Sequence, residues 1–128
     1  MYRTIFAVVF LLLALDALAM NTDLVGKWKG GYETPTGSGV IEVTLSHQDK
    51  EWKAVCKFPE VDDEENTFLA EELKVSEMEV SFLIEVENKS GQMRFKGKPV
   101  GEKIEGRFER FIEGKSVYTG LWNIERSK

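Results

Sequence analysis

The chain has 128 residues and a formal net charge of −5, from 17 lysines and arginines against 22 acidic residues. This charge argues against a broad nucleic-acid-binding face, which needs clustered basic residues. One cysteine and one histidine exclude an intramolecular disulfide and any metal site built from several of these residues. We therefore expect one folded domain with no cofactor and no metal, preceded by a targeting segment.

Residues 1–19 have the three parts of a secretory signal peptide. Arg3 gives a positive start, Ile5–Leu15 is an unbroken apolar run, and Ala17–Ala19 has the spacing of a cleavage site. The run is shorter than the ~20 residues that span a bilayer, so we expect cleavage between Ala19 and Met20 rather than a retained anchor. Residues 20–128 then form a single secreted or periplasmic domain with no stable membrane span.

Apolar and polar residues alternate along most of the mature chain, which is the pattern of strands with one buried face. Short segments that contain glycine or asparagine separate these strands, and short connections join antiparallel neighbours. The sequence predicts eight strands, at Val25–Glu33, Gly39–His47, Glu51–Phe58, Phe68–Val75, Glu79–Glu87, Gly91–Lys98, Lys103–Phe111 and Ser116–Glu125.

Eight strands with one apolar face each, and no amphipathic helix to cover them, must close on themselves or form a two-layer sandwich. Closure also removes exposed sheet edges. The short connections favour an all-β protein, an antiparallel up-and-down meander closed into a barrel. A β-sandwich is the alternative.

The tripeptide Gly26-Lys27-Trp28 stands near the start of this exported meander, and it resembles the sequence signature of lipocalins. In that family the tryptophan closes the bottom of the barrel, and a basic residue after the last strand packs on it. The resemblance implies that Gly26, Trp28 and Arg126 form such a closure here, with the guanidinium over the indole. The disulfide, the long C-terminal helix and the second motif of typical lipocalins are not present in the sequence.

Short motifs also occur at Gly26–Gly30, Trp52–Ala54, Phe95–Gly97, Ile104–Gly106 and Trp122–Arg126. Together they resemble a small all-β accessory domain that precedes the α/β-hydrolase domain of many secreted bacterial serine hydrolases. The G-x-S-x-G nucleophile motif of those hydrolases is absent from this sequence. The resemblance therefore implies an accessory domain without the enzyme.

Few residues have the chemistry of a catalytic or metal site. His47 lies beside a turn with no recognised nucleophile near it, and Cys56 shares the phase of the apolar face. The run Asp62–Glu65 has the carboxylates of a calcium site but not the spacing of a calcium-binding loop, so we expect a solvated loop. We predict no catalytic residue and no enzymatic activity.

Two functional hypotheses follow. The first is a secreted, non-catalytic, lipocalin-like binding protein that holds a small apolar or amphipathic ligand inside its barrel. The residues predicted to line that interior are Trp28, Trp52, Phe82, Phe95, Phe108, Arg110 and Tyr118. The second is a protein-interaction module, such as an accessory domain or an inhibitor of an exported hydrolase. In either case we expect a monomer.

Two observations bear on the choice between these hypotheses. So many large inward side chains could fill the interior of a small barrel, which weakens the first hypothesis. Arg110 shares the inward phase, so it must lie near a barrel end, be paired or face a polar ligand, unless a β-bulge changes the phase. The apolar residues Leu83, Phe111, Val117 and Leu121 have the outward phase and would form a partner surface if they cluster.

Overall fold

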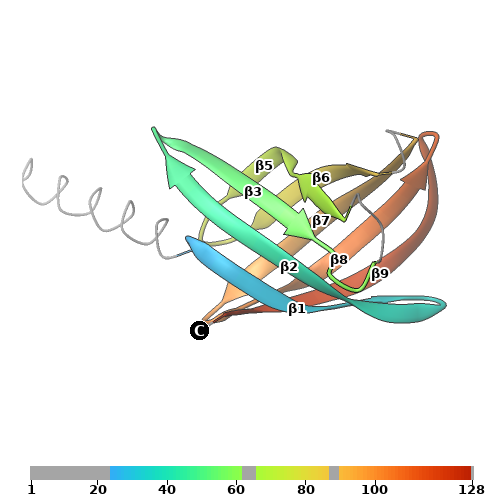
Figure 1. The fold of residues 1–128 in the computed structure, drawn as a ribbon, viewed down its shortest axis with the longest axis horizontal. Coiled ribbons are helices and arrows are strands. Elements are labelled where there is room, and N and C mark those ends of the chain that lie inside the picture. The colour runs from blue at the N-terminus through green and yellow to red at the C-terminus, as the bar shows by residue number, and fades with distance from the viewer. Residues whose placement is uncertain (1–23, 62–65, 87–89, 128) are drawn as a thin grey trace, which may run out of the picture.

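The computed structural model describes residues 24–61, 66–86 and 90–127, which form one antiparallel sheet of nine strands (Figure 1). The strand order, β4-β3-β2-β1-β9-β8-β7-β6-β5, pairs the first strand with the last and otherwise follows the chain. The protein is therefore an all-β, up-and-down barrel that is nearly closed, and the described residues form no second sheet. The strands are β1 (Gly26–Thr34), β2 (Gly37–Gln48), β3 (Glu51–Lys57), β4 (Thr67–Leu69), β5 (Glu71–Val75), β6 (Val80–Val86), β7 (Gly91–Val100), β8 (Lys103–Ile112) and β9 (Lys115–Arg126).

The prediction of eight strands is wrong by one, because the segment expected as a single strand at Phe68–Val75 is divided in two. Its first part, β4, pairs with β3, whereas its second part, β5, pairs with β6. Between them, the Ala70 N–H donates to the Ala54 carbonyl, and within β5 Glu72 has a positive φ of 51°. The two edges of the sheet are thus consecutive pieces of chain, and the seam of the barrel lies between them.

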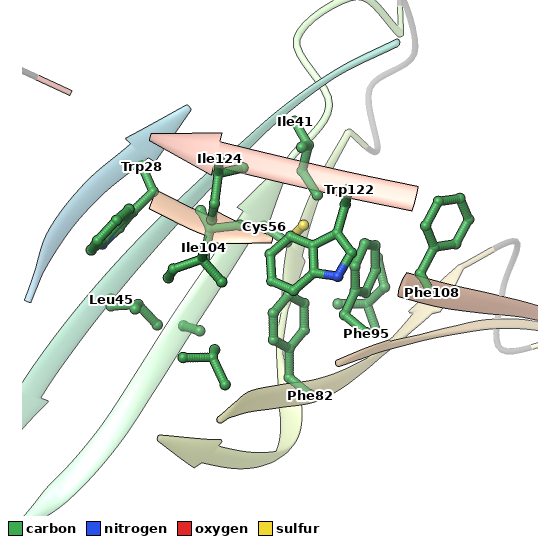
Figure 2. Packing of buried hydrophobic residues seen from close by; sticks show 14 of the residues in the cluster. Trp28, Ile41, Leu45, Cys56, Phe82, Phe95, Ile104, Phe108, Trp122 and Ile124 are labelled. Carbon is green, nitrogen blue, oxygen red and sulfur yellow. The ribbon is translucent and has the colours of Figure 1, made fainter. Parts of the chain in front are cut away.

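Large side chains fill the central part of the barrel. Trp28 and Phe95 have no exposed area, and Phe82, Phe108 and Trp122 are at most 2% exposed. Phe95 stacks on Phe82 and Phe108, with ring centroids 4.9 and 5.4 Å apart, and Trp122 meets Phe82 and Phe95 edge-on (Figure 2). A water-sized void beside these rings would appear as exposed area, so this part of the barrel is a close-packed core.

Glycines on neighbouring strands make room for these side chains. The ladder places Gly97 of β7 opposite Gly106 of β8, and Gly106 opposite Trp122 of β9. A Cβ on Gly97 would lie 2.7 Å from the Trp122 ring, and a Cβ on Gly106 would lie 2.5 Å from the Gly97 Cα. Glycine therefore lets the two backbones and the ring approach closely. The same arrangement occurs for Tyr32 with Gly39, Phe108 with Gly120 and Arg110 with Gly91.

We predict that Gly106→Ala lowers the free energy of unfolding by about 2–3 kcal/mol, as overpacking of a tight site does. The added methyl would meet the backbone of β7, which cannot move aside as a side chain could. Gly37→Ala is the matched control, because nothing lies within 4 Å of a Cβ at that position. Its effect should stay within about 0.5 kcal/mol in urea unfolding followed by tryptophan fluorescence. Equal losses in the two variants would contradict the steric role of Gly106.

Candidate functional site

The structure does not bring the predicted ligand-binding residues together at one place. Trp52 lies near the turn between β2 and β3, at one end of the barrel, with its ring 4.8 Å from that of His47. Arg110 and Tyr118 lie at the opposite end, where they pair across β8 and β9. The other four, Trp28, Phe82, Phe95 and Phe108, belong to the packed core.

The end of the barrel near the turn between β8 and β9 combines two tyrosines with a buried arginine. Tyr32 and Tyr118 are half-buried, and each packs edge-on against Phe108, at 6.1 and 6.2 Å between centroids. Burial raises the pKa of Tyr32, with smaller contributions from the nearby Tyr118 and Glu60. Arg110 is only 7% exposed. This end of the barrel therefore places two hydroxyl groups and a guanidinium beside aromatic rings.

The sequence left two possibilities for Arg110, an inward side chain or a β-bulge that changes the phase of the strand. The structure contains both an inward Arg110 and a bulge next to it. Arg110 keeps the inward phase, and the register between β8 and β9 shifts immediately after it, between Arg110 and Phe111. Tyr118 pairs with Arg110 and Ser116 pairs with Phe111, so Val117 of β9 is the extra residue of the bulge. The pairing of β8 with β7 has no such shift, so Ile112 keeps the phase of Arg110 and pairs with the buried Gly91. Ile112 is nevertheless 42% exposed, at the last position of β8.

The opposite end of the barrel is covered by the residues that the lipocalin resemblance singled out. The Arg126 guanidinium carbon lies 4.5 Å from the centroid of the buried Trp28 ring. Arg126 Nη1 donates to the Val25 carbonyl at 2.8 Å, and its Nε lies 3.2 Å from the Glu102 carboxylate. A Cβ on Gly26 would lie 3.2 Å from the same Nη1, so glycine leaves space for the guanidinium there. Hydrogen bonds and a cation–π contact thus hold this end together.

The two residues considered for catalysis, His47 and Cys56, are both engaged in side-chain packing. The ring of His47 packs against Trp52, and Cys56 is fully buried in the core. Burial raises the pKa of the Cys56 thiol, which disfavours the reactive thiolate. Asp62–Glu65 lies outside the described residues. Within the described ranges, no group of three or more histidine, cysteine or acidic residues is arranged to hold a metal ion.

The outer face of the sheet carries a hollow of about 890 Å³ that extends over β2, β1, β9 and β8. Leu121 lies in it with half of its side chain exposed, at 51%. The ladder places Glu33 on one side of Leu121 and Arg107 on the other. Gly31, which is exposed, adds no side chain to fill the space. Leu121 is thus an exposed apolar residue between opposite charges in this hollow.

The outward-phase apolar residues of the sequence located this hollow only in part. Leu121 and Val117 are exposed as their outward phase predicts, but Leu83 is only 7% exposed. Phe111 pairs with Ser116, whereas Leu121 pairs with Arg107 further along β9, so Phe111 and Leu121 are not cross-strand neighbours. The glycines inside β1 and β8, which line the hollow, were the signal that could have located it.

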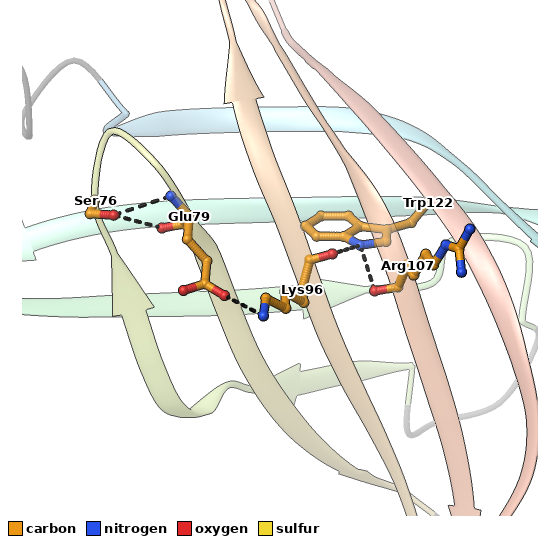
Figure 3. Close-up of polar contacts among 5 residues, drawn as sticks. All are labelled: Ser76, Glu79, Lys96, Arg107 and Trp122. Atoms are coloured by element: carbon orange, nitrogen blue, oxygen red, sulfur yellow. Dashed lines mark hydrogen bonds and ion pairs between the residues drawn. The ribbon is translucent and has the colours of Figure 1, made fainter.

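Trp122 connects the core to this outer face. Its indole Nε1 donates to the main-chain oxygens of Lys96 and Arg107, at 3.1 Å each (Figure 3). Lys96 and Arg107 are opposite each other on β7 and β8, and both are exposed. The buried indole therefore fixes the two strands at the place where two cationic side chains project outward.

No protein-family model, curated protein or solved structure matches this chain. The observed architecture is compatible with a lipocalin-like barrel. The part of the chain that the structure describes contains no helix with the length and apolar character needed to cross a membrane. The predicted signal peptide, residues 1–19, lies outside that part.

We predict that Cys56 reacts with the thiol reagent DTNB only as the protein unfolds, because the side chain is buried and the thiolate is disfavoured. The native protein should react slowly, and the protein in 6 M guanidinium chloride should react at once. Val55→Cys adds a matched thiol on the exposed side of the same strand, so that variant should show one fast and one protected thiol. Fast reaction of the native protein would contradict burial of Cys56.

Proposed function

We propose that this protein is an exported, non-catalytic binding module that acts through the outer face of its barrel, as a protein-interaction domain. The packed interior is the observation that supports this function most. A barrel of this size has room for its own side chains or for one small ligand. The rings of Trp28, Phe82, Phe95, Phe108 and Trp122 occupy that room, and removing one such ring from a core costs about 3–5 kcal/mol.

The outer hollow supports the same proposal. Protein interfaces typically combine an apolar centre with a polar rim, and their energy is concentrated in a few central residues. Leu121 offers such a centre, with Glu33 and Arg107 as charged neighbours in its own register row. The packing of His47 against Trp52 and the burial of Cys56 also favour a binding role over a catalytic one.

Export and the class of partner are proposed from the sequence. The signal peptide of residues 1–19 supports secretion or transfer to the periplasm. The resemblance to an accessory domain of secreted serine hydrolases makes an exported enzyme the first partner class to test. We further propose that the chain is a monomer apart from this partner.

We predict that a photo-crosslinker at the hollow captures a discrete partner. With p-benzoylphenylalanine in place of Leu121, irradiation of the exporting cells should give one adduct of defined mass, identified by mass spectrometry. The additional change Arg107→Glu should reduce the yield severalfold. Val100 is the control position, because it is exposed at the turn between β7 and β8 and does not line the hollow. Absence of an adduct at position 121, or identical adducts at both positions, would contradict the proposed function.

The buried Arg110 favours one second candidate, a small amphipathic ligand held at the end of the barrel beside Tyr32 and Tyr118. Native mass spectrometry of gently purified protein separates the two candidates. If the protein acts through its outer face, the spectrum should show only the mass of the polypeptide, with no bound small molecule. A small molecule that leaves on denaturation, and that is lost in Arg110→Met but retained in Leu121→Ser, would favour the second candidate.

A further inference from the structure

The hollow at Leu121 continues beyond β8. A second hollow of about 520 Å³ over β7 and β8 shares Arg107 with the first. A third, of about 590 Å³ over β5, β6 and β7, shares Lys96 and Glu79 with the second. Because each hollow shares lining residues with the next, the three lie side by side along the outer face from β2 to β5, and we call them together the groove.

The ladder arranges the floor of this groove as one row of side chains. Leu121 is opposite Arg107, Arg107 is opposite Lys96, Lys96 is opposite Ser81, and Ser81 is opposite Lys74. Neighbouring strands are about 4.8 Å apart, so the row from β9 to β5 is about 19 Å long. An extended peptide of about six residues spans that length.

Three of the five side chains in the row, Arg107, Lys96 and Lys74, are cationic, although the chain has a net charge of −5. The carboxylates of Glu72 and Glu79 line the hollow at the same end. Lys96 and Arg107 are directly opposite each other, and like charges in that position destabilise a sheet. Glu79 lies 3.3 Å from Lys96, at the edge of the groove, and the Trp122 indole holds both strands from inside (Figure 3). The Glu79 carboxylate already lowers this repulsion at Lys96, and an anionic group bound beside Arg107 would lower it further.

We propose that this groove docks an extended acidic segment of a protein partner. The segment places an apolar side chain on Leu121 and its carboxylates against Arg107, Lys96 and Lys74. This inference rests on the proposed function, because it names the partner of the same outer face.

The charge pattern of the groove favours a peptide over a uniform polyanion. Three carboxylates, those of Glu33, Glu105 and Glu125, line the groove around Leu121. They would repel the evenly spaced charges of a nucleic acid or a sulfated polysaccharide. A peptide can present an apolar residue at that end and acidic residues at the basic end.

The test uses a fluorescein-labelled peptide of one leucine followed by five glutamates, with binding measured by fluorescence anisotropy at low ionic strength. We expect saturable binding that weakens as salt is raised, since the charges are solvent-exposed. Arg107→Glu should weaken binding at least tenfold. Lys53→Glu makes the same change in net charge on exposed Lys53 of β3, outside the groove, and should alter binding less than twofold.

Other probes separate a peptide site from simple charge attraction. Replacing the leucine of the peptide with serine should weaken binding severalfold, and inorganic polyphosphate should bind more weakly than the peptide. Equal binding of all three probes would overturn the inference in favour of general anion binding. An equal loss of affinity in Lys53→Glu and Arg107→Glu would overturn it as well.

The crosslinking experiment at position 121 distinguishes failure of this inference from failure of the proposed function. An adduct at that position without binding of the acidic peptide would overturn the inference alone, because the partner would then use different chemistry. Absence of both would overturn the inference and the proposed function together. An adduct whose contact segment is acidic, mapped by mass spectrometry, would support both.

Discussion

The close approach of β7 and β8 beneath the Trp122 indole is the contact on which the rest of the structure depends. Gly97 and Gly106 face each other there, and only hydrogen in place of a side chain leaves room for the ring. The indole N–H then reaches the main-chain oxygens of Lys96 and Arg107. On the inside, the ring completes the core, whereas on the outside the same strands present two adjacent cations. One pair of glycines therefore influences both the filled interior and the charged outer face.

The strands and their inward faces could be predicted from the sequence, because a strand with one buried face must alternate. The division of the strand predicted at Phe68–Val75 also left a signal. Phe68 and Ala70 share one phase, whereas Leu73 and Val75 share the other, and two successive glutamates, Glu71 and Glu72, separate them. A change of phase by one residue is the mark of a bulge or a break. The first half pairs with β3 and the second with β6. This choice of neighbours depends on the nearly closed barrel as a whole, which no local sequence pattern reveals.

The candidate site was less predictable than the fold. Alternation indicates which side chains point inward, but whether they leave a cavity depends on the residues opposite them. Phe108, for example, lies over Gly120, and Tyr32 lies over Gly39, so rings occupy space that the glycines leave open. The outer groove likewise depends on cross-strand register, since Leu121, Arg107 and Lys96 are far apart in sequence and adjacent only in the ladder.

A filled barrel also fits the energetics of a small domain. An empty apolar cavity costs about 24 cal/mol per Å³, so a ligand-sized cavity of about 300 Å³ would cost about 7 kcal/mol. The total stability of a domain is typically only about 5–15 kcal/mol. The single cysteine of this chain is buried and unpaired with another, so no intramolecular disulfide offsets such a loss. Aromatic packing therefore provides stability inside the barrel. On the outside, the ladder holds Leu121, Arg107 and Lys96 in fixed register, so the binding that we propose there would require little ordering of the backbone.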